Sequence, residues 1–159
     1  MNFQCAGITD SVIDGHGISL MIWFSGCHFN CNSCHNPDLQ NPNYGFQETT
    51  EKIIEHWNKR NIFYDSVVFS GGEPLNQSDA LYEIISNINK SKWLYTGYYM
   101  IDIPIKIIKL MDVVIAGPYI ESKKTNSGFP ASSNQQIIFR GELVNANKFE
   151  LRERIRSIV

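Results

Sequence analysis

Apolar residues in this chain gather in short runs separated by turns, and the runs alternate between strand and helix spacing. Residues 18–25 form an almost continuous apolar run of strand length, rich in β-forming residues, which predicts a buried strand. Residues 50–60 then place Ile53 and Trp57 at helical spacing behind threonines, with charged residues on the other face. The first clear elements are therefore a strand followed by an amphipathic helix.

The same alternation continues along the chain and predicts the class of fold. Further strands are expected at 65–70, 93–96 and 113–116, helices after Ser78 and over 104–110, then a hairpin of 136–139 with 142–144 and a helix over 148–158. Alternation of this kind predicts a parallel sheet with right-handed crossovers. Four or five parallel strands are too few for a complete barrel of about 250 residues. We therefore expect an α/β fold, a partial, open (β/α) barrel with a mostly parallel sheet.

Length and composition support an ordinary globular domain. The chain has 159 residues, and at about 150 residues per domain this predicts one domain over 1–159. Hydrophobic residues make up 43% and charged residues 19%, and the net charge of −2 offers no basic surface for nucleic acid. The sequence shows neither a secretory signal nor an apolar run of membrane-spanning length, so we expect a cytoplasmic protein with no membrane partner.

Three of the four cysteines, Cys27, Cys31 and Cys34, are crowded into eight positions directly after the predicted strand 18–25. Such crowding indicates a metal site in a reducing compartment more than a disulfide framework. Loops at the carboxyl ends of strands are where α/β sheets bind ligands. Three thiolates suit a cluster of four irons, in which one iron keeps open positions. We therefore interpret these cysteines as metal ligands.

Two other metal sites fit the same residues. A structural zinc ion usually takes four ligands, and His28 or His35 could supply the fourth. An electron-transfer ferredoxin would also need a fourth ligand, for which Cys5 is the remaining cysteine. Cys5 stands far from the others in sequence, and we expect it to be a small buried side chain.

The spacing C-x-x-x-C-x-x-C after the first strand resembles the radical S-adenosylmethionine (SAM) superfamily, and within it the glycyl radical enzyme activases. The resemblance covers most of the chain and rests on an ordered set of motifs around the cysteines. They are Asp14-Gly15-His16-Gly17, Gly71-Gly72-Glu73-Pro74, Tyr95-Thr96-Gly97-Tyr98 and Ser132-Ser133-Asn134-Gln135. The chain departs from the family where Ala116-Gly117 replaces Asp-Gly, and where Phe129-Pro130-Ala131 precedes the last motif.

The resemblance implies both cofactors and their binding residues. Cys27, Cys31 and Cys34 would hold a [4Fe–4S] cluster, and the open iron would bind the methionine part of SAM. Glycines let a backbone approach a ligand closely, and a carboxylate attracts an ammonium group. The residues that the resemblance assigns to SAM are Gly71, Gly72, Glu73, Phe29, Ser33, His35, Tyr95 and Thr96.

The family also implies the reaction and the partners. Electron transfer to SAM yields a 5′-deoxyadenosyl radical, which would remove a hydrogen atom from a glycine of a glycyl radical enzyme. The target that the resemblance implies is anaerobic ribonucleotide reductase, although Cys34-His35-Asn36 resembles activases of pyruvate formate-lyase. A flavodoxin-like protein would donate the electron. A small-molecule substrate, and a non-catalytic iron–sulfur or zinc interaction module, are the alternatives.

Overall fold

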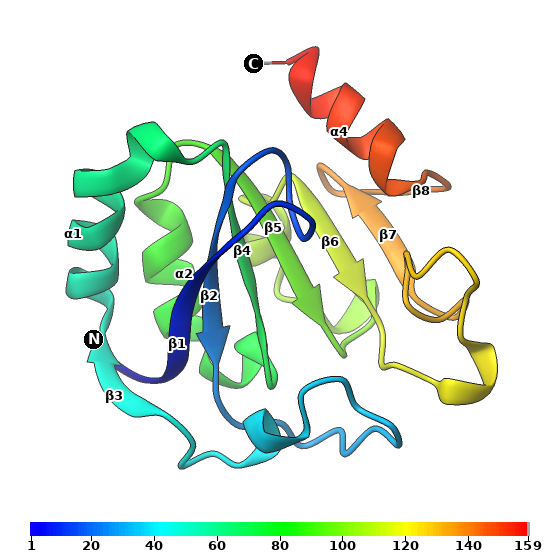
Figure 1. The fold of residues 1–159 in the computed structure, drawn as a ribbon, viewed down its shortest axis with the longest axis horizontal. Helices are drawn as coiled ribbons and strands as arrows, with labels where there is room; N and C mark the ends of the chain where they lie inside the picture. Colours follow the sequence, from blue (N-terminus) through cyan, green and yellow to red (C-terminus); the bar gives the residue numbers. More distant parts are fainter. Residues whose placement is uncertain (159) are drawn as a thin grey trace.

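The computed structural model describes residues 1–158, and its centre is one eight-stranded sheet (Figure 1). The strand order is β3-β1-β2-β4-β5-β6-β7-β8, so β3 and β8 are the edges and the sheet is open. The strands are β1 (Asn2–Ser11), β2 (Ser19–Phe24), β3 (Phe46–Thr49), β4 (Ser66–Gly71), β5 (Ser91–Thr96), β6 (Val113–Ala116), β7 (Gln136–Phe139) and β8 (Glu142–Val144). The expected α/β class is confirmed.

The prediction of a mostly parallel sheet is wrong. Strands β2, β4, β5 and β6 form three parallel pairings, whereas the two sides of the sheet contribute four antiparallel ones. The reason is local, because β1 folds back on β2 as a hairpin and β7 turns into β8 through Arg140-Gly141. Short connections can only join antiparallel neighbours, while the helical crossovers join the central parallel strands.

Helices cover the two faces of the sheet unequally. On one face, α1 (Thr50–Arg60), α2 (Ser78–Ser86) and α3 (Ile105–Ile108) pack with the inward residues of the parallel strands, among them Leu20 and Phe69. The other face, which includes Met21 and Trp93, is covered in part by α4 (Lys148–Arg156) through Leu151 and Ile155. Successive side chains of a strand point to opposite faces, which explains the two cores.

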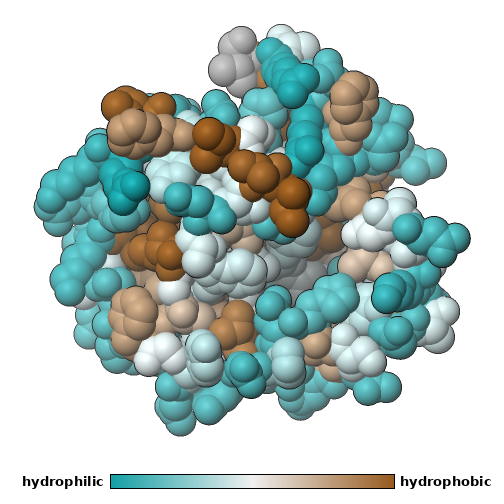
Figure 2. Space-filling model, viewed as in Figure 1, coloured by the Kyte–Doolittle hydropathy of each residue, from teal (hydrophilic) through white to brown (hydrophobic). Residues whose placement is uncertain are grey.

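Helix α4 is tied to the turn between β1 and β2. Lys148 Nζ donates to the carbonyl of Ile13 at 2.7 Å, and Arg152 Nε donates to the carbonyl of Gly15 at 2.8 Å. Figure 2 shows an apolar band over the tip of this hairpin, where Val12, Ile13 and Ile18 are exposed. Within residues 1–158, no helix is both long and apolar enough to cross a membrane. Helix α4 is thus fixed by these hydrogen bonds to the turn between β1 and β2.

Candidate metal and cofactor site

The cysteine loop, residues 25–36, begins at the carboxyl end of β2 and is fixed to the segment that follows it. The short 3₁₀ helix η1 (Pro37–Gln40) accepts two backbone hydrogen bonds from the loop's start. The N–H of Gly26 donates to the carbonyl of Leu39 at 2.8 Å, and that of Cys27 to Gln40 at 3.1 Å. The first cysteine is therefore held by backbone contacts that do not depend on a metal.

The other two cysteines each follow a residue in the left-handed region. Asn30 has a φ of 47° and precedes Cys31, and Ser33 has a φ of 59° and precedes Cys34. Non-glycine residues seldom adopt this conformation, although asparagine does so more readily than most. The N–H of Cys34 donates to the carbonyl of Cys31 at 3.3 Å. These turns bring all three cysteines to one cavity, of about 150 Å³.

The remaining walls of this cysteine cavity come from the carboxyl ends of the parallel strands. Of the eight residues assigned to SAM from sequence, seven line the cavity with the cysteines: Phe29, His35, Gly71, Gly72, Glu73, Tyr95 and Thr96. Ser33 does not line it, and its side chain is exposed. The left-handed backbone at Ser33 turns the chain toward Cys34, so this residue contributes through its conformation.

The Gly71-Gly72-Glu73 segment packs directly on the cysteine loop. The N–H of Gly72 donates to Phe24 and that of Glu73 to Gly26, both at 2.8 Å. A Cβ atom at Gly72 would lie 2.5 Å from the carbonyl oxygens of Gly26 and Leu39. Only glycine fits this approach, so the motif sets the position of the loop that carries Cys27.

The carboxylate of Glu73 is buried and faces the neighbouring strand. Its oxygens accept hydrogen bonds from the N–H of Leu75 at 2.9 Å, the hydroxyl of Thr96 at 2.8 Å and the N–H of Gly97 at 2.7 Å. Burial raises the pKa of the Glu73 carboxyl above its ordinary value, while these donors act to lower that pKa. Glu73 is 0% exposed although it lines the cavity, so its charge acts on the cavity from behind the wall.

Aromatic side chains and a further glycine complete this end of the sheet. Phe29 meets Tyr98 edge to face with the ring centroids 5.1 Å apart, and a Cβ atom at Gly97 would lie 2.5 Å from the Phe29 ring. Tyr95 donates its hydroxyl hydrogen to the carbonyl of Asp14 at 2.7 Å. The Tyr95-Thr96-Gly97-Tyr98 motif therefore packs against both the cysteine loop and the Asp14-Gly15-His16-Gly17 turn.

The late motif also reaches the cavity. Gln135 lines it and donates from its side chain to the carbonyl of Gly117 at 2.9 Å. Asn134 donates to the carbonyl of Pro118 at 2.8 Å. The segment after β6, where Ala116-Gly117 stands, is thus fixed by two amide side chains.

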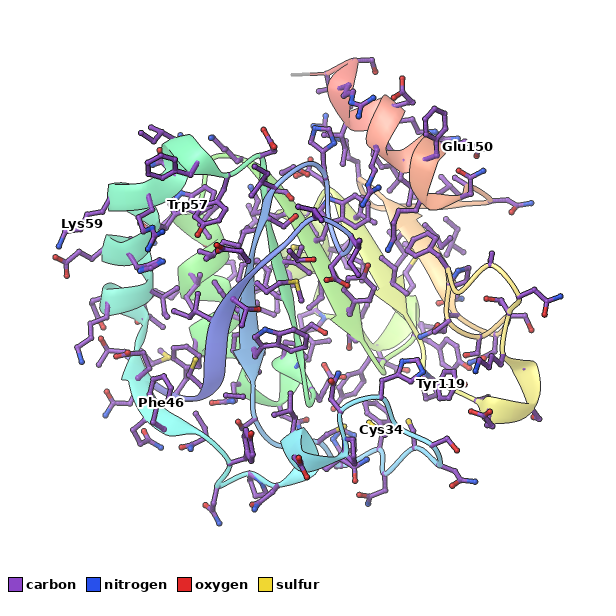
Figure 3. The ribbon with its side chains drawn as sticks, in the orientation of Figure 1. Cys34, Phe46, Trp57, Lys59, Tyr119 and Glu150 are labelled. Atoms are coloured by element: carbon purple, nitrogen blue, oxygen red, sulfur yellow. The ribbon has the colours of Figure 1, made fainter. Side chains whose placement is uncertain are left out.

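Sequence reasoning missed Ser70 and Tyr119 as lining residues. Ser70 lies directly before Gly71, and Tyr119 follows β6 after Gly117 and Pro118. Tyr119 packs against His35 with the ring centroids 4.8 Å apart, and Figure 3 shows Tyr119 and Cys34 at the same end of the sheet. Both missed residues lie at the carboxyl ends of parallel strands, which is the signal that could have identified them.

Three cysteine thiols at one cavity suit a cluster of four irons, in which one iron keeps open positions. Within residues 1–158, no group of three His, Cys, Asp or Glu side chains is gathered closely enough to hold a single ion. A structural zinc ion would usually need a fourth ligand as well. Burial raises the pKa of the Cys27 thiol, so metal binding must drive its deprotonation.

A larger cavity, of about 480 Å³, lies away from the cysteines around His16, Lys92 and Arg140. Its Lys92 and Arg140 side chains already have hydrogen-bond or ion-pair partners within the protein. Lys92 Nζ donates to the carbonyls of Ile88 and Lys90, and Arg140 forms an ion pair with Asp112 at 3.1 Å. The chemistry-bearing residues are therefore those of the smaller cysteine cavity.

Comparison with known proteins gives the same picture. Residues 13–138 match the family described as a 4Fe-4S single cluster domain. The anaerobic ribonucleoside-triphosphate reductase-activating protein of Enterobacteria phage T4 is 28% identical over 138 residues, 79% of this chain and 86% of that protein. Its counterpart from Escherichia coli (strain K12) is 24% identical over 140 residues, 80% of this chain and 91% of that protein.

A different activating enzyme has a higher identity over a shorter region. The pyruvate formate-lyase-activating enzyme of Clostridium pasteurianum is 36% identical over 90 residues, which are 54% of this chain. The match spans 37% of that enzyme's length.

Proposed function

Since the chain belongs to the 4Fe-4S single cluster domain family, we propose that it activates anaerobic ribonucleotide reductase by generating a glycyl radical on it. The resemblance to radical SAM activases predicted from the sequence is confirmed, as are the iron–sulfur cluster and SAM as cofactors. The observation that carries the target is that the relatives matched over most of their length are activating proteins of that reductase.

We assign the cluster to Cys27, Cys31 and Cys34. Their thiols line one cavity on a loop that is fixed by backbone hydrogen bonds to η1 and to Gly71-Gly72-Glu73. Three ligands for four irons leave one iron free for SAM. When bound, the reduced cluster supplies the electron that cleaves SAM to methionine and a 5′-deoxyadenosyl radical.

The chain's own residues would bind and orient SAM. The carbonyls of the Gly71-Gly72-Glu73 segment can accept hydrogen bonds from the ammonium group, and the buried Glu73 charge strengthens that attraction. Phe29, His35, Tyr95 and Thr96 supply the walls of the cavity, and Ser33 sets the turn before Cys34. Fixed polar groups around the bound molecule favour one orientation of its reacting bond.

We further propose that the open sheet acts as a partial (β/α) barrel and that residues 1–159 work as one radical SAM domain. The cysteine cavity adjoins a second cavity of about 300 Å³, whose walls include Trp23 and Phe129. The two cavities share five lining residues, namely His35, Asn36, Ser70, Tyr95 and Gln135. Figure 2 shows this face hollowed beside the β1–β2 hairpin. An open side of this kind would admit a protein segment. We expect a cytoplasmic protein with a flavodoxin-like electron donor.

A second candidate target is a glycyl radical enzyme of the pyruvate formate-lyase type. Its activating enzyme has the higher identity over the matched region, and Cys34-His35-Asn36 resembles that group. The two candidates share the SAM chemistry and differ only in the protein that receives the radical.

One experiment tests the proposal and separates the targets. The protein is reconstituted with iron and sulfide without oxygen, reduced and given SAM, and 5′-deoxyadenosine is measured. Anaerobic ribonucleotide reductase or pyruvate formate-lyase is then added, and the glycyl radical doublet is recorded by electron paramagnetic resonance. We expect cleavage with either partner and the doublet with the reductase. A doublet on pyruvate formate-lyase alone would favour the second target, and no cleavage would overturn both.

A further inference from the structure

Strand β1 is a sheet edge over half of its length. Strand β3 pairs with residues Asn2 to Cys5 of β1, whereas β2 pairs with β1 as far as Ser11. Figure 1 shows β3 beside only the first part of β1. In an antiparallel pair, alternate residues turn their N–H and C=O groups away from the partner strand. Residues 7–11 therefore present outward backbone groups that no neighbouring strand in residues 1–158 satisfies.

This free edge borders a groove. A cavity of about 390 Å³ has residues 6–9 of β1 as one wall and residues 35–39 with Tyr44 as the other. Trp23 lines the groove as well, and its indole N–H donates to the hydroxyl of Thr9 at 2.7 Å. A chain that lies along the edge would thus have main-chain partners on one side and an aromatic surface for a side chain.

The groove leads to the cysteine cavity. His35 and Asn36 line both, and they also line the 300 Å³ cavity over Ser70 and Tyr95. Trp23 belongs to the groove and to that middle cavity. Lining residues shared between neighbouring cavities therefore connect the free edge to the cavity of the cluster ligands.

The free part of this edge has few of the usual protections: it contains no lysine or proline, and Asp10 is its one charged residue. Natural edge strands are commonly blocked by lysine, proline or short length. Residues 7–11 read Gly-Ile-Thr-Asp-Ser, and β1 is ten residues long. The irregularity in its pairing lies between Cys5 and Gly7, before the free part begins. Such an edge is a template for an additional strand.

We propose that the glycyl radical enzyme docks an extended segment next to its target glycine along residues 7–11 of β1, as an added strand. The inference rests on the proposed function, which requires a partner glycine to reach the cysteine cavity. Main-chain hydrogen bonds hold the segment regardless of its sequence, and the Trp23 and Tyr44 side of the groove selects a side chain. The connected walls then lead the chain to the cavity.

Amide hydrogen exchange with anaerobic ribonucleotide reductase and SAM tests the proposal. We expect outward amides among residues 7–11 to exchange at least about tenfold more slowly in the complex. Radical formation on the reductase with no added protection there would overturn the inference. Protection without SAM cleavage would instead overturn the proposed function and leave the docking standing. Protection already present in the free chain through self-association would show that a second copy occupies the edge, and would also overturn it.

A matched pair of tyrosine variants gives a second readout. Tyr44 and Tyr82 are 42% and 38% exposed, and Tyr82 lies on α2 away from the groove. We expect Tyr44→Ala to raise the reductase concentration needed for half-maximal radical formation by about tenfold, as loss of an interface tyrosine can. Tyr82→Ala should leave it unchanged. The amount of glycyl radical is expressed per 5′-deoxyadenosine, which corrects each variant for cluster content. Equal values for both variants would contradict a docking role for the groove.

Discussion

The hydroxyl of Thr96 donates a 2.8 Å hydrogen bond to the carboxylate of Glu73, and this contact joins the ends of two neighbouring parallel strands beside the cysteine cavity. Glu73 follows β4 and Thr96 ends β5. The same carboxylate also binds the N–H groups of Leu75 and Gly97. Glu73 therefore holds together the strand ends from which the site is built.

Replacing Thr96 by valine should destabilise the protein markedly. The variant keeps the side-chain shape but removes one donor from a buried carboxylate, and a hydrogen bond to a charged group is worth about 1.5–3 kcal/mol. Thr125→Val is the control, because its hydroxyl donates at 2.6 Å to the neutral carbonyl of Pro130 and should cost about 1 kcal/mol. The free energies of unfolding in urea compare the two. An equal or smaller loss for Thr96→Val would argue against the bridging role of Glu73.

Replacing Gly72 by alanine should prevent stable cluster binding. The added Cβ atom would lie 2.5 Å from two backbone oxygens of the cysteine loop region, so the loop must move away from β4. Gly141→Ala is the control, because its φ of 87° is unfavourable for alanine but the nearest atom is 3.8 Å away. We expect Gly141→Ala to cost about 1 kcal/mol of stability and to keep its cluster. Iron and sulfide per chain after desalting give the result, and full cluster content in Gly72→Ala would disprove the steric argument.

Alanine at Cys27, Cys31 or Cys34 should abolish the cluster absorbance and SAM cleavage together, because each variant loses a thiolate ligand. Cys5→Ala is the matched control. Cys5 is fully buried in the core away from the cavity, and burial raises the pKa of its thiol. We expect this variant to lose about 1 kcal/mol of stability while it retains the cluster. Loss of the cluster in Cys5→Ala would point instead to a fourth cysteine ligand.

The metal-free protein should lose stability as the pH falls through the titration of His16. Burial lowers the pKa of His16 below its ordinary value of about 6.5, so the unfolded chain takes up a proton before the folded chain does. The free energy of unfolding should therefore decrease as the pH drops below about 6.5, until the folded pKa is passed. His16→Gln should make this slope smaller than it is in the unsubstituted protein. Urea unfolding between neutral and mildly acidic pH measures the slope in both proteins, and an unchanged slope in His16→Gln would exclude His16 as its source.

Most of the regular elements could be predicted because their signals are local. The strand β6 and the hairpin strands β7 and β8 have the predicted bounds, and helix α1 covers the predicted residues 50–60. These segments combine a buried apolar run, or a helical stripe, with clear turns at their ends. The strands at the other side of the sheet lack such signals. In β1, Phe3 and Cys5 alternate inward, but Gly7 and the pairing irregularity interrupt the pattern.

Strand β3 shows why the sheet direction was mispredicted. Its four residues include the exposed Phe46 and no buried side chain, so their hydrophobicity pattern carries little information. The strand exists because it pairs with residues 2–5, more than forty positions away. Contacts between such distant segments are set by the whole fold and not by local preference. The same holds for Tyr119, whose place beside His35 depends on the order of the central strands.

The hydrogen bonds between α4 and the β1–β2 turn have a consequence for how the protein folds during translation. Arg152 binds the carbonyl of Gly15 across 137 positions of sequence. At a translation rate of about 5–20 residues per second, α4 is synthesised on the order of ten seconds after the β1–β2 hairpin. Through that interval the apolar face later covered by Leu151 and Ile155 lies open. A nascent chain of this protein therefore exposes the sheet face that borders its future radical site until α4 has been synthesised.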